Sequence, residues 1–355
     1  MLRSPEPMSP HSILLIKLRA LGDVILSTPV VWNLRQAFPK AQIAFLTEET
    51  GAELLENDPA LNEVIVYPRQ AMESMAGVSR IGEERRFLAR LKAKKYDWVI
   101  DLFGNPRSAW LTYLSGAKKR IGFAYHFRKW AYNVKVPPKN PQYVVEFNLD
   151  ALRVLGIPVV DSRLKVHLRE EDRAFAEAYW SRQRLGGEGP VMGLFPGGGW
   201  ESKRWGLKGF AEVGDALKQE FGAKVLLIGG KKEEQDLEQI AGMMQKRPAI
   251  LSEATLGQLA AVTAKLAMWI GNDSGPRYLA VAFEVPTVTI FGPTDAANAT
   301  PPGRRHLAVT AEVPCLICNK TTCPFKPLDE RHQQCMRKLS PDQVIKAARS
   351  LLNGG

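Results

Sequence analysis

The stretch ILLIKLRALGDVILSTPVVWNL, residues 13–34, decides how this chain folds. Its first six residues form an apolar run of strand length, and a helical pattern starts directly after the short loop RALGD. Strand, loop and helix in this order are the opening of a parallel α/β sheet. One Gly22-Asp23 pair stands at the junction where a dinucleotide-binding fold places three spaced glycines.

The same alternation of strands and helices continues along the chain and restarts near residue 160. Residues 24–38 read as one helix with Pro29 near its first turn, and VVDSRLKVHL (159–168) reads as a linker and strand. Strands are expected at IAFLT, EVIVY, WVIDL, VMGLFP, KVLLIGG, AMWIGND and PTVTIFG. The predicted fold class is therefore α/β, with two parallel sheets whose strand C-termini border a cleft.

A length of 355 residues fits two domains of ordinary size. We expect a leader (1–11), an N-terminal domain (12–162), a C-terminal domain (163–340) and a closing helix (341–355). The leader lacks the apolar region of a secretory signal, and no apolar run approaches the ~18 residues that span a bilayer. All four cysteines follow residue 314, so they cannot link the domains, and a cytoplasmic protein is expected.

Lys and Arg outnumber Asp and Glu by 48 to 37, which gives a net charge of +11. Such an excess favours anionic partners, namely nucleic acid, an acidic membrane surface or a phosphorylated substrate. A generally basic soluble protein remains the alternative. Neither GxGxxG nor GxxxxGK[ST] occurs, which disfavours a nicotinamide enzyme or a P-loop ATPase.

Two loops in the second half are predicted to bind phosphate. In PGGGWESKRW (196–205), Gly198 and Gly199 allow close backbone approach, and Lys203 supplies a positive charge near Ser202. In IGNDSGPRYLA (270–280), a strand ends at Asp273 and a helix is expected to open at Ser274-Gly275-Pro276. A flexible turn and ordinary helix capping are the respective alternatives.

Two further loops have weaker functional interpretations. Lys231, in IGGKKEEQ (228–235), lies where it can border a nucleotide, although a plain strand-to-helix turn explains the loop as well. Asp23 follows the first strand, where a carboxylate can act as general base on an acceptor hydroxyl. The alternative is that Asp23 only caps the helix that follows.

Four segments together resemble glycosyltransferase family 9, the bacterial heptosyltransferases. They are LIKLRALGDVILSTPVV, FPGGGWESKRW, GNDSGPRYLAVAFEVPTVTIFGPT and the late CxxC segment, and the resemblance runs from about residue 12 to 350. It implies a GT-B fold with two Rossmann-like domains around a cleft. It also implies inverting transfer of heptose from ADP-L-glycero-D-manno-heptose to the lipopolysaccharide inner core, with no cofactor for catalysis.

The resemblance assigns roles to residues of both domains. It implies that Asp23 is the base, that Lys203 neutralises donor phosphate, and that Asp273, Ser274 and Gly275 hold the diphosphate. Gly198 and Gly199 stand where relatives often carry hydroxyls, so only backbone donors remain there. Tyr278 stands where the family commonly has His, and a tyrosine donates a hydrogen bond but carries no charge at neutral pH.

Basic and aromatic residues alternate between residues 107 and 135. The set comprises Arg107, Lys118, Lys119, Arg120, His126, Arg128 and Lys129, with Trp110, Tyr113, Phe123, Tyr125, Phe127 and Trp130. The acceptor that the resemblance implies is an anionic lipid-linked saccharide, and we expect Arg19, Arg107, Arg120 and Arg128 to contact it at the inner membrane surface. A solvated loop with core aromatics is the alternative, and no nucleic-acid module is recognisable.

The C-terminal segment CLICNKTTCPFKPLDERHQQC contains Cys315, Cys318, Cys323 and Cys335. A C-x2-C pair followed by two thiols predicts a structural metal clip, for which zinc is the favoured ion. Free thiols in a loop or a pair of disulfides are the alternatives.

The expected function is a cytoplasmic, inverting ADP-heptose transferase that contacts the inner membrane peripherally. A family relative using another nucleotide sugar, a non-catalytic sugar-nucleotide-binding protein and a GT-B-like epimerase are the alternatives. An activity that needs no acceptor would indicate the epimerase, and binding without turnover the binding protein.

Overall fold

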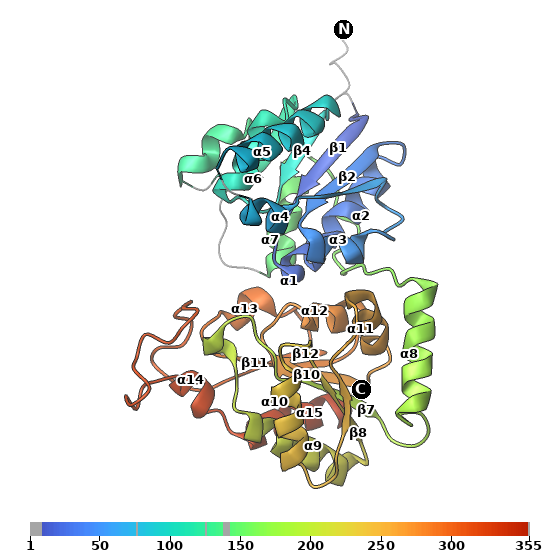
Figure 1. The fold of residues 1–355 in the computed structure, drawn as a ribbon, viewed down its shortest axis with the longest axis vertical. Helices are drawn as coiled ribbons and strands as arrows, with labels where there is room; N and C mark the ends of the chain where they lie inside the picture. The colour runs from blue at the N-terminus through green and yellow to red at the C-terminus, as the bar shows by residue number, and fades with distance from the viewer. Residues whose placement is uncertain (1–8, 76, 125, 138–142, 354–355) are drawn as a thin grey trace. The chain divides into compact units, whose positions relative to one another are not determined.

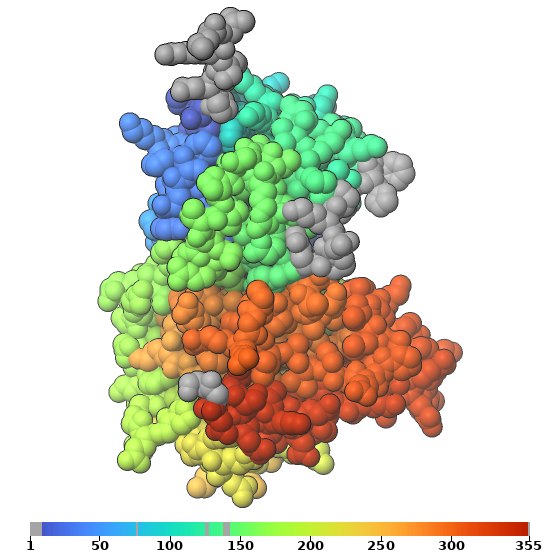
Figure 2. Space-filling model, turned by 180° about the vertical axis from the view of Figure 1, so that it is seen from behind, coloured from blue at the N-terminus to red at the C-terminus, as the bar shows by residue number. Residues whose placement is uncertain are grey.

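The computed structural model describes residues 9–75, 77–124, 126–137 and 143–353. The chain forms two compact units, of which the first ends at His167 and the second begins at Leu168. They are coloured blue to green and green to red (Figure 1, Figure 2). Residues 1–8 of the expected leader lie outside the described residues. Among the helices that are described, none combines the length and the hydropathy that crossing a bilayer requires.

The first unit is a parallel sheet of six described strands in the order β3-β2-β1-β4-β5-β6 (Figure 1). Its elements are β1 (Ser12–Ile16), α1 (Leu21–Ile25), α2 (Thr28–Ala37), β2 (Gln42–Thr47), α3 (Glu49–Leu55), β3 (Glu63–Val66), α4 (Arg69–Ser74), α5 (Gly77–Ala93), β4 (Trp98–Asp101), α6 (Pro106–Leu114), β5 (Lys119–Phe123), the 3₁₀ helix η1 (His126–Ala131), β6 (Val134–Val136) and α7 (Val144–Arg153).

Strand β1 lies near the centre of this sheet because it is apolar on both faces. Ile13 through Ile16 are fully buried, as expected for a strand covered by helices on both sides. Leu14 and Ile16 belong to one core cluster with side chains of α4, α5 and α6. Strand β4 pairs with β1 and is followed by α6. Asn105 caps the start of α6, because its side chain accepts the backbone N–H of Ser108 at 2.7 Å.

The helix predicted over residues 24–38 is wrong as a single element, because the chain forms α1 and α2 with a turn between them. The Ser27 hydroxyl donates to the carbonyl of Val24 (2.7 Å) and the Thr28 hydroxyl to that of Ile25 (2.8 Å), so side chains satisfy the last carbonyls of α1. Helix α2 then starts with Pro29 in its first turn, where a missing N–H is tolerated.

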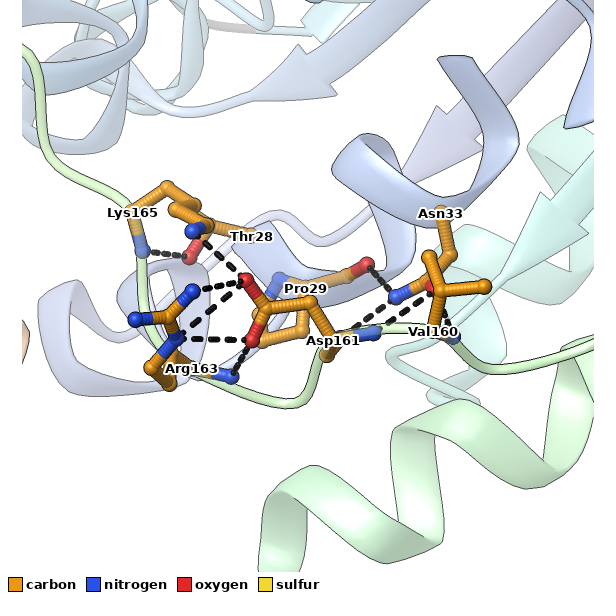
Figure 3. A network of polar contacts seen from close by, with 7 residues as sticks. All are labelled: Thr28, Pro29, Asn33, Val160, Asp161, Arg163 and Lys165. Carbon is orange, nitrogen blue, oxygen red and sulfur yellow. Dashed lines mark hydrogen bonds and ion pairs between the residues drawn. The ribbon is translucent and has the colours of Figure 1, made fainter. Parts of the chain in front are cut away.

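The strand predicted within residues 159–168 is also wrong. This segment has no strand partner in the described structure and instead runs along α2 (Figure 3). The Asn33 amide donates to the carbonyl of Asp161 (2.6 Å) and accepts the N–H of Val160 (2.7 Å), while the Thr28 hydroxyl accepts the N–H of Lys165 (2.9 Å). Side chains of α2 thus take up backbone groups that a neighbouring strand would otherwise bind.

The second unit has the same design, with six described strands in the order β12-β11-β10-β7-β8-β9. Its elements are α8 (Glu170–Arg182), β7 (Val191–Phe195), the 3₁₀ helix η2 (Glu201–Lys203), α9 (Leu207–Phe221), β8 (Lys224–Ile228), α10 (Glu234–Met243), β9 (Ala249–Leu251), α11 (Leu256–Thr263), β10 (Met268–Asn272), α12 (Arg277–Ala282), β11 (Thr287–Phe291), α13 (Ala296–Ala299), β12 (His306–Thr310), α14 (Gln334–Arg337) and α15 (Pro341–Asn353).

Alternate residues of these strands pack into two separate cores. Leu194 and Ile270 lie in the core shared with α9, α10 and α15, whereas Phe195 and Trp269 lie in the core shared with α8, α11 and α12. Period-two alternation of a strand explains this division. The C-terminal helix α15 is part of the second unit, since its red surface adjoins the yellow region at the base of that unit (Figure 2) and Arg349 pairs with Glu220 of α9 at 2.7 Å.

Both sheets have the strand order 3-2-1-4-5-6 when numbered within their own unit. The chain reverses direction across the sheet between β1 and β4 in the first unit, and between β7 and β10 in the second. Ligands of open α/β sheets bind beyond the strand C-termini at such switch points. The α/β prediction with two parallel sheets is confirmed. The strand order selects two candidate loops in each unit, those after β1 and β4 in the first and those after β7 and β10 in the second.

Candidate active site

The two phosphate-binding loops predicted in the second half leave neighbouring strands, because β7 and β10 pair directly with Phe195 opposite Gly271. Asn272, which is fully buried, ties the loops together. Its amide donates to the carbonyl of Pro196 (2.6 Å) and its oxygen accepts the N–H of Trp205 (3.2 Å). The loops after β7 and β10 therefore form one continuous edge of the sheet.

The glycines of this edge have different steric roles. A Cβ at Gly271 would lie 2.6 Å from the carbonyl oxygen of Phe195, so the close approach of the strands there requires glycine. A Cβ at Gly198 would lie 3.4 Å from the Arg204 side chain, and one at Gly199 would meet nothing within 4 Å. Open space thus faces the backbone of Gly199, where the sequence predicts a ligand.

Lys203 and Asp273 form the charged centre of the site. The Lys203 ammonium lies 2.7 Å from Oδ2 of Asp273, which also accepts the hydroxyl of Thr294 at 2.7 Å. Nε of Arg277 lies 3.4 Å from Oδ1 of the same carboxylate. Burial opposes ionisation of Asp273, but the charges of Arg277 and Lys203 and the hydrogen bonds outweigh it and hold the pKa of this carboxyl below its ordinary value.

Thr294 and Arg277 also belong to this centre, and neither was predicted from the sequence. Thr294 follows β11, which pairs with β10, so its position at the end of a third neighbouring strand was an available signal. Arg277 carried no such signal, because a charged residue in a helix is usually exposed, whereas this guanidinium is fully buried.

The helix expected to open at Ser274 begins later, at Arg277, and that prediction is corrected. Tyr278 N–H donates to the carbonyl of Gly275 (3.1 Å) and Leu279 N–H to that of Pro276 (3.0 Å), which are the i→i−3 bonds of a tight turn. The Ser274 hydroxyl is buried without a hydrogen-bond partner among the described residues. The Tyr278 hydroxyl donates to the carbonyl of Ala299 (3.1 Å), inside the unit.

Three other residues hold or border the loop after β7. The Ser202 hydroxyl is buried and donates to the carbonyl of Lys320 (2.6 Å), which fastens the loop to the cysteine segment. Nε of Arg204, another residue the sequence analysis missed, donates to the carbonyl of Gly198 (3.2 Å). Lys231 is exposed in the turn before α10.

Asp23 lies at the switch point of the first unit, as the third residue of α1. Its Oδ2 accepts the N–H of Ala20 at 3.2 Å, so the carboxylate does cap its own short helix. The side chain is nevertheless partly exposed, and one carboxylate can accept several hydrogen bonds. Asp23 therefore caps α1 while the residue stays partly exposed, and the two interpretations of Asp23 do not exclude each other.

Two buried ionisable residues behind Asp23 were not predicted. The Lys17 ammonium, at the end of β1, donates to the carbonyl of Leu102 at 2.8 Å; burial lowers its pKa, while the charges of Asp23 and Asp101 oppose that shift. Asp101, at the end of β4, accepts the Tyr132 hydroxyl at 2.7 Å. Burial raises the pKa of Asp101. Hydrogen bonds from Gly104, Tyr132, Ser108 and Phe103 lower it but do not cancel the effect of burial.

The four arginines expected to contact the acceptor differ in position. Arg19 is exposed in the loop between β1 and α1, and the Arg107 guanidinium lies 5.3 Å from the centre of the Tyr67 ring. Arg120 lies in β5 opposite Val99, before the strand C-termini, and donates to the carbonyls of Ala117 and Ala131. Arg128 is partly exposed in η1. Tyr125 and the side chains of His126 and Phe127 lie outside what the structure describes.

The four cysteine thiols border one small cavity next to Ser202 and Gln334. All four are free, and burial together with Cys315, Cys318 and Cys323 raises the pKa of the Cys335 thiol to about 11. Among the described residues no group of three His, Cys, Asp or Glu side chains is placed to hold a metal ion. The expected structural zinc is therefore not supported, and the thiols are arranged as free thiols in a loop.

Comparisons with known proteins agree with this architecture. Residues 84–329 match the family "Glycosyltransferase family 9 (heptosyltransferase)". The chain is 29% identical to lipopolysaccharide heptosyltransferase 1 of Pseudomonas aeruginosa, over 96% of this chain and 98% of that one.

Two solved structures share the fold. A family 9 glycosyltransferase from Veillonella parvula is 25% identical with a TM-score of 0.80, covering 97% of this chain and 98% of that one. E. coli heptosyltransferase WaaC, solved with ADP-2-deoxy-2-fluoro heptose, is 21% identical with a TM-score of 0.72, covering 96% and 99%. The fold is thus the GT-B fold. Because the family match covers more than half of this chain, the chain is a glycosyltransferase that belongs to family 9, the heptosyltransferases.

Proposed function

We propose that this protein transfers heptose from ADP-heptose to the inner core of lipopolysaccharide, with inversion at the anomeric carbon. Support comes from the family, from its likeness to a lipopolysaccharide heptosyltransferase, and from a relative solved with an ADP-heptose analogue. The observation that carries the proposal is the Lys203–Asp273 pair at a switch-point edge, where nucleotide ligands bind.

The donor is assigned to the second unit on electrostatic grounds. Two cations, Lys203 and Arg277, surround one carboxylate, that of Asp273, so the set has one net positive charge. Arg277 is fully buried, and the Lys203 side chain is 15% exposed, so Lys203 is the cation that can reach a diphosphate. The buried Ser274 hydroxyl and the backbone N–H groups of Gly198, Gly199 and Gly275 are proposed as further donors to it. Ser202, Lys231 and Tyr278 were predicted to bind the donor. Lys231 is proposed to border the nucleotide, and Ser202 and Tyr278, whose hydroxyls donate to the carbonyls of Lys320 and Ala299, are proposed to hold the loops around it.

The acceptor is assigned to the first unit, with Asp23 as general base. The carboxylate takes the proton of an acceptor hydroxyl, whose oxygen attacks the anomeric carbon on the face opposite the diphosphate. The bond from that carbon to the diphosphate oxygen breaks, ADP leaves, and Lys203 stabilises the charge that grows on it. Arg19, Arg107, Arg120 and Arg128 are proposed to attract the acceptor's phosphate and carboxylate groups, with the enzyme at the cytoplasmic face of the inner membrane.

Nucleotide selectivity tests the proposal. Thermal unfolding is measured for the wild type and Lys203→Met with ADP, UDP or GDP. ADP is expected to stabilise the wild type selectively, by about 2.7 kcal/mol at a hundredfold excess over its Kd, and to stabilise Lys203→Met much less. Stabilisation by UDP or GDP instead would indicate the relative that uses another nucleotide sugar.

A further inference from the structure

An aromatic cluster on the surface of the first unit has no role in the proposed chemistry. Trp110, Tyr113 and Trp130 are 53%, 46% and 45% exposed, respectively. Trp110 and Tyr113 lie on α6, beside α5 (Figure 1), and Trp130 lies on η1. The ring centres of Trp110 and Trp130 are 4.8 Å apart and those of Tyr113 and Trp130 are 5.2 Å apart, so the exposed rings form one patch.

The core does not account for this patch. Helix α6 already buries Ser108, Ala109, Leu111 and Thr112 against the rest of the unit. Trp110, Tyr113 and Leu114 follow the i, i+3, i+4 spacing of the opposite, outward face. Scattered exposed apolar residues are ordinary, but a contiguous aromatic face marks an interaction surface.

The stretch of sequence that contains the patch carries charge of one sign. Residues 102–145 contain eight Lys or Arg and no Asp or Glu. Lys118 and Lys129 are exposed, and the guanidinium of Arg120 lies 5.6 Å from the centre of the Tyr113 ring. The patch is thus aromatic, with Arg120 beside it and exposed lysines on the same stretch of sequence. A partner with an anionic surface and an apolar layer behind it suits both features.

We propose that the Trp110–Tyr113–Trp130 patch inserts into the headgroup region of an anionic phospholipid bilayer. Trp and Tyr rings favour this interface because one part of each ring is apolar and another bonds with water. Lysines near an anionic leaflet contribute about 1 kcal/mol each, and a shallow apolar contact plus basic residues gives reversible binding. The rings pack edge to face at 62° and 72°, so they do not form the flat platform on which successive bases or sugars stack.

The inference rests on the proposed function in one respect, namely that the acceptor is lipid-linked and held at a membrane. The first measurement, vesicle binding, needs neither donor nor acceptor. Full-length protein is floated with phosphatidylcholine vesicles with and without phosphatidylglycerol, at low and high salt. Wild type is expected to bind only the vesicles with phosphatidylglycerol, most strongly at low salt, with a blue shift of tryptophan emission and quenching by brominated lipid.

Two double variants test the aromatic rings and the lysines of the surface separately. The double variant Trp110→Ser/Trp130→Ser is expected to weaken vesicle binding about tenfold or more. Lys118→Glu/Lys129→Glu is expected to weaken it about a hundredfold. The matched controls are Met243→Ala, an exposed apolar residue of α10, and Lys208→Glu, an exposed lysine of α9; both should bind as wild type does. An unchanged circular dichroism spectrum and an unchanged thermal unfolding midpoint verify that each variant is folded.

Three results would overturn the inference. In the first, the tryptophan variant binds vesicles as strongly as the wild type does. In the second, that variant loses activity on a delipidated water-soluble acceptor. In the third, oligonucleotides compete with vesicles for the wild type. The second would assign the rings to the sugar acceptor and the third to nucleic acid. If vesicle binding follows the variants as expected while no heptose transfer is found, the membrane patch stands and the proposed function fails.

Discussion

Nζ of Lys203 lies 2.7 Å from Oδ2 of Asp273, although 70 residues separate them in the chain. The pair exists because β7 and β10 are neighbours at the switch point, so the loops that follow them meet. Asp273 holds both Lys203 and the buried Arg277, and it therefore links stability of the second unit to the proposed donor site.

Asp273 should contribute more than Lys203 to the free energy of unfolding. Asp273→Asn leaves the buried Arg277 cation without its counter-charge, and we expect a loss of roughly 3–5 kcal/mol in the free energy of unfolding. Lys203→Met leaves Asp273 with Arg277 and Thr294, so its loss should stay near about 1 kcal/mol. Urea unfolding followed by circular dichroism measures both, and equal losses would contradict this division.

Asp23→Asn should lower kcat about 10²- to 10⁴-fold because the amide cannot take the acceptor proton. The fold should persist, since the amide oxygen can still accept the Ala20 N–H. ADP binding should be unchanged, because Asp23 belongs to the first unit. Glu49→Gln, an exposed acid at the start of α3, is the control; a fully active Asp23→Asn enzyme would remove Asp23 from the role of base.

Two glycines of the donor edge form a matched pair. Gly271→Ala should destabilise the protein by about 1–3 kcal/mol, because its methyl group would meet the backbone of Phe195. Gly199→Ala should leave stability within about 0.5 kcal/mol but raise KM for the donor, because the methyl enters the open space proposed for the diphosphate. A donor KM that Gly199→Ala leaves untouched would place the diphosphate elsewhere.

Asn33→Ala tests the attachment of residues 160–165 to α2 (Figure 3). It removes the bonds to Asp161 and Val160 and leaves partly buried backbone groups without these partners, for an expected loss of roughly 1–3 kcal/mol. Limited proteolysis in this segment should accelerate. Arg163→Ala, which removes a surface ion pair, should change stability by less than about 1 kcal/mol, and a comparable effect would argue against the role of Asn33.

His306 should make the second unit sensitive to acid. Burial, with Arg277 and Arg305, lowers the pKa of His306 from 6.5 to about 4, so it is neutral in the folded protein at pH 7. Between these values the unfolded chain binds the extra proton, so stability is complete above pH 6.5 and falls as the pH drops towards 4, by roughly 3 kcal/mol. His306→Gln should flatten urea midpoints over this range; an unchanged slope would assign the acid sensitivity to other groups.

The sequence by itself determined the local features. The apolar run 13–18 predicted a buried strand, which the structure forms as β1 over Ser12–Ile16, and the glycines after Phe195 marked the loop that leaves β7. Strand and loop types follow from residues close in sequence, through period-two burial and the φ/ψ freedom of glycine. The four family segments, read in order, identified the family and the GT-B fold, and the match and solved relatives confirmed both.

Only the tertiary structure decided which distant residues meet. Strand order made neighbours of the loops that contain Lys203 and Asp273, and placed Thr294 and a fully buried Arg277 beside them. Within the segment predicted as a strand, residues 160–165 instead bind to side chains of α2. The four cysteines are free thiols. These outcomes depend on contacts between residues far apart in the chain. A local sequence pattern does not show which residues become buried or which charges become neighbours.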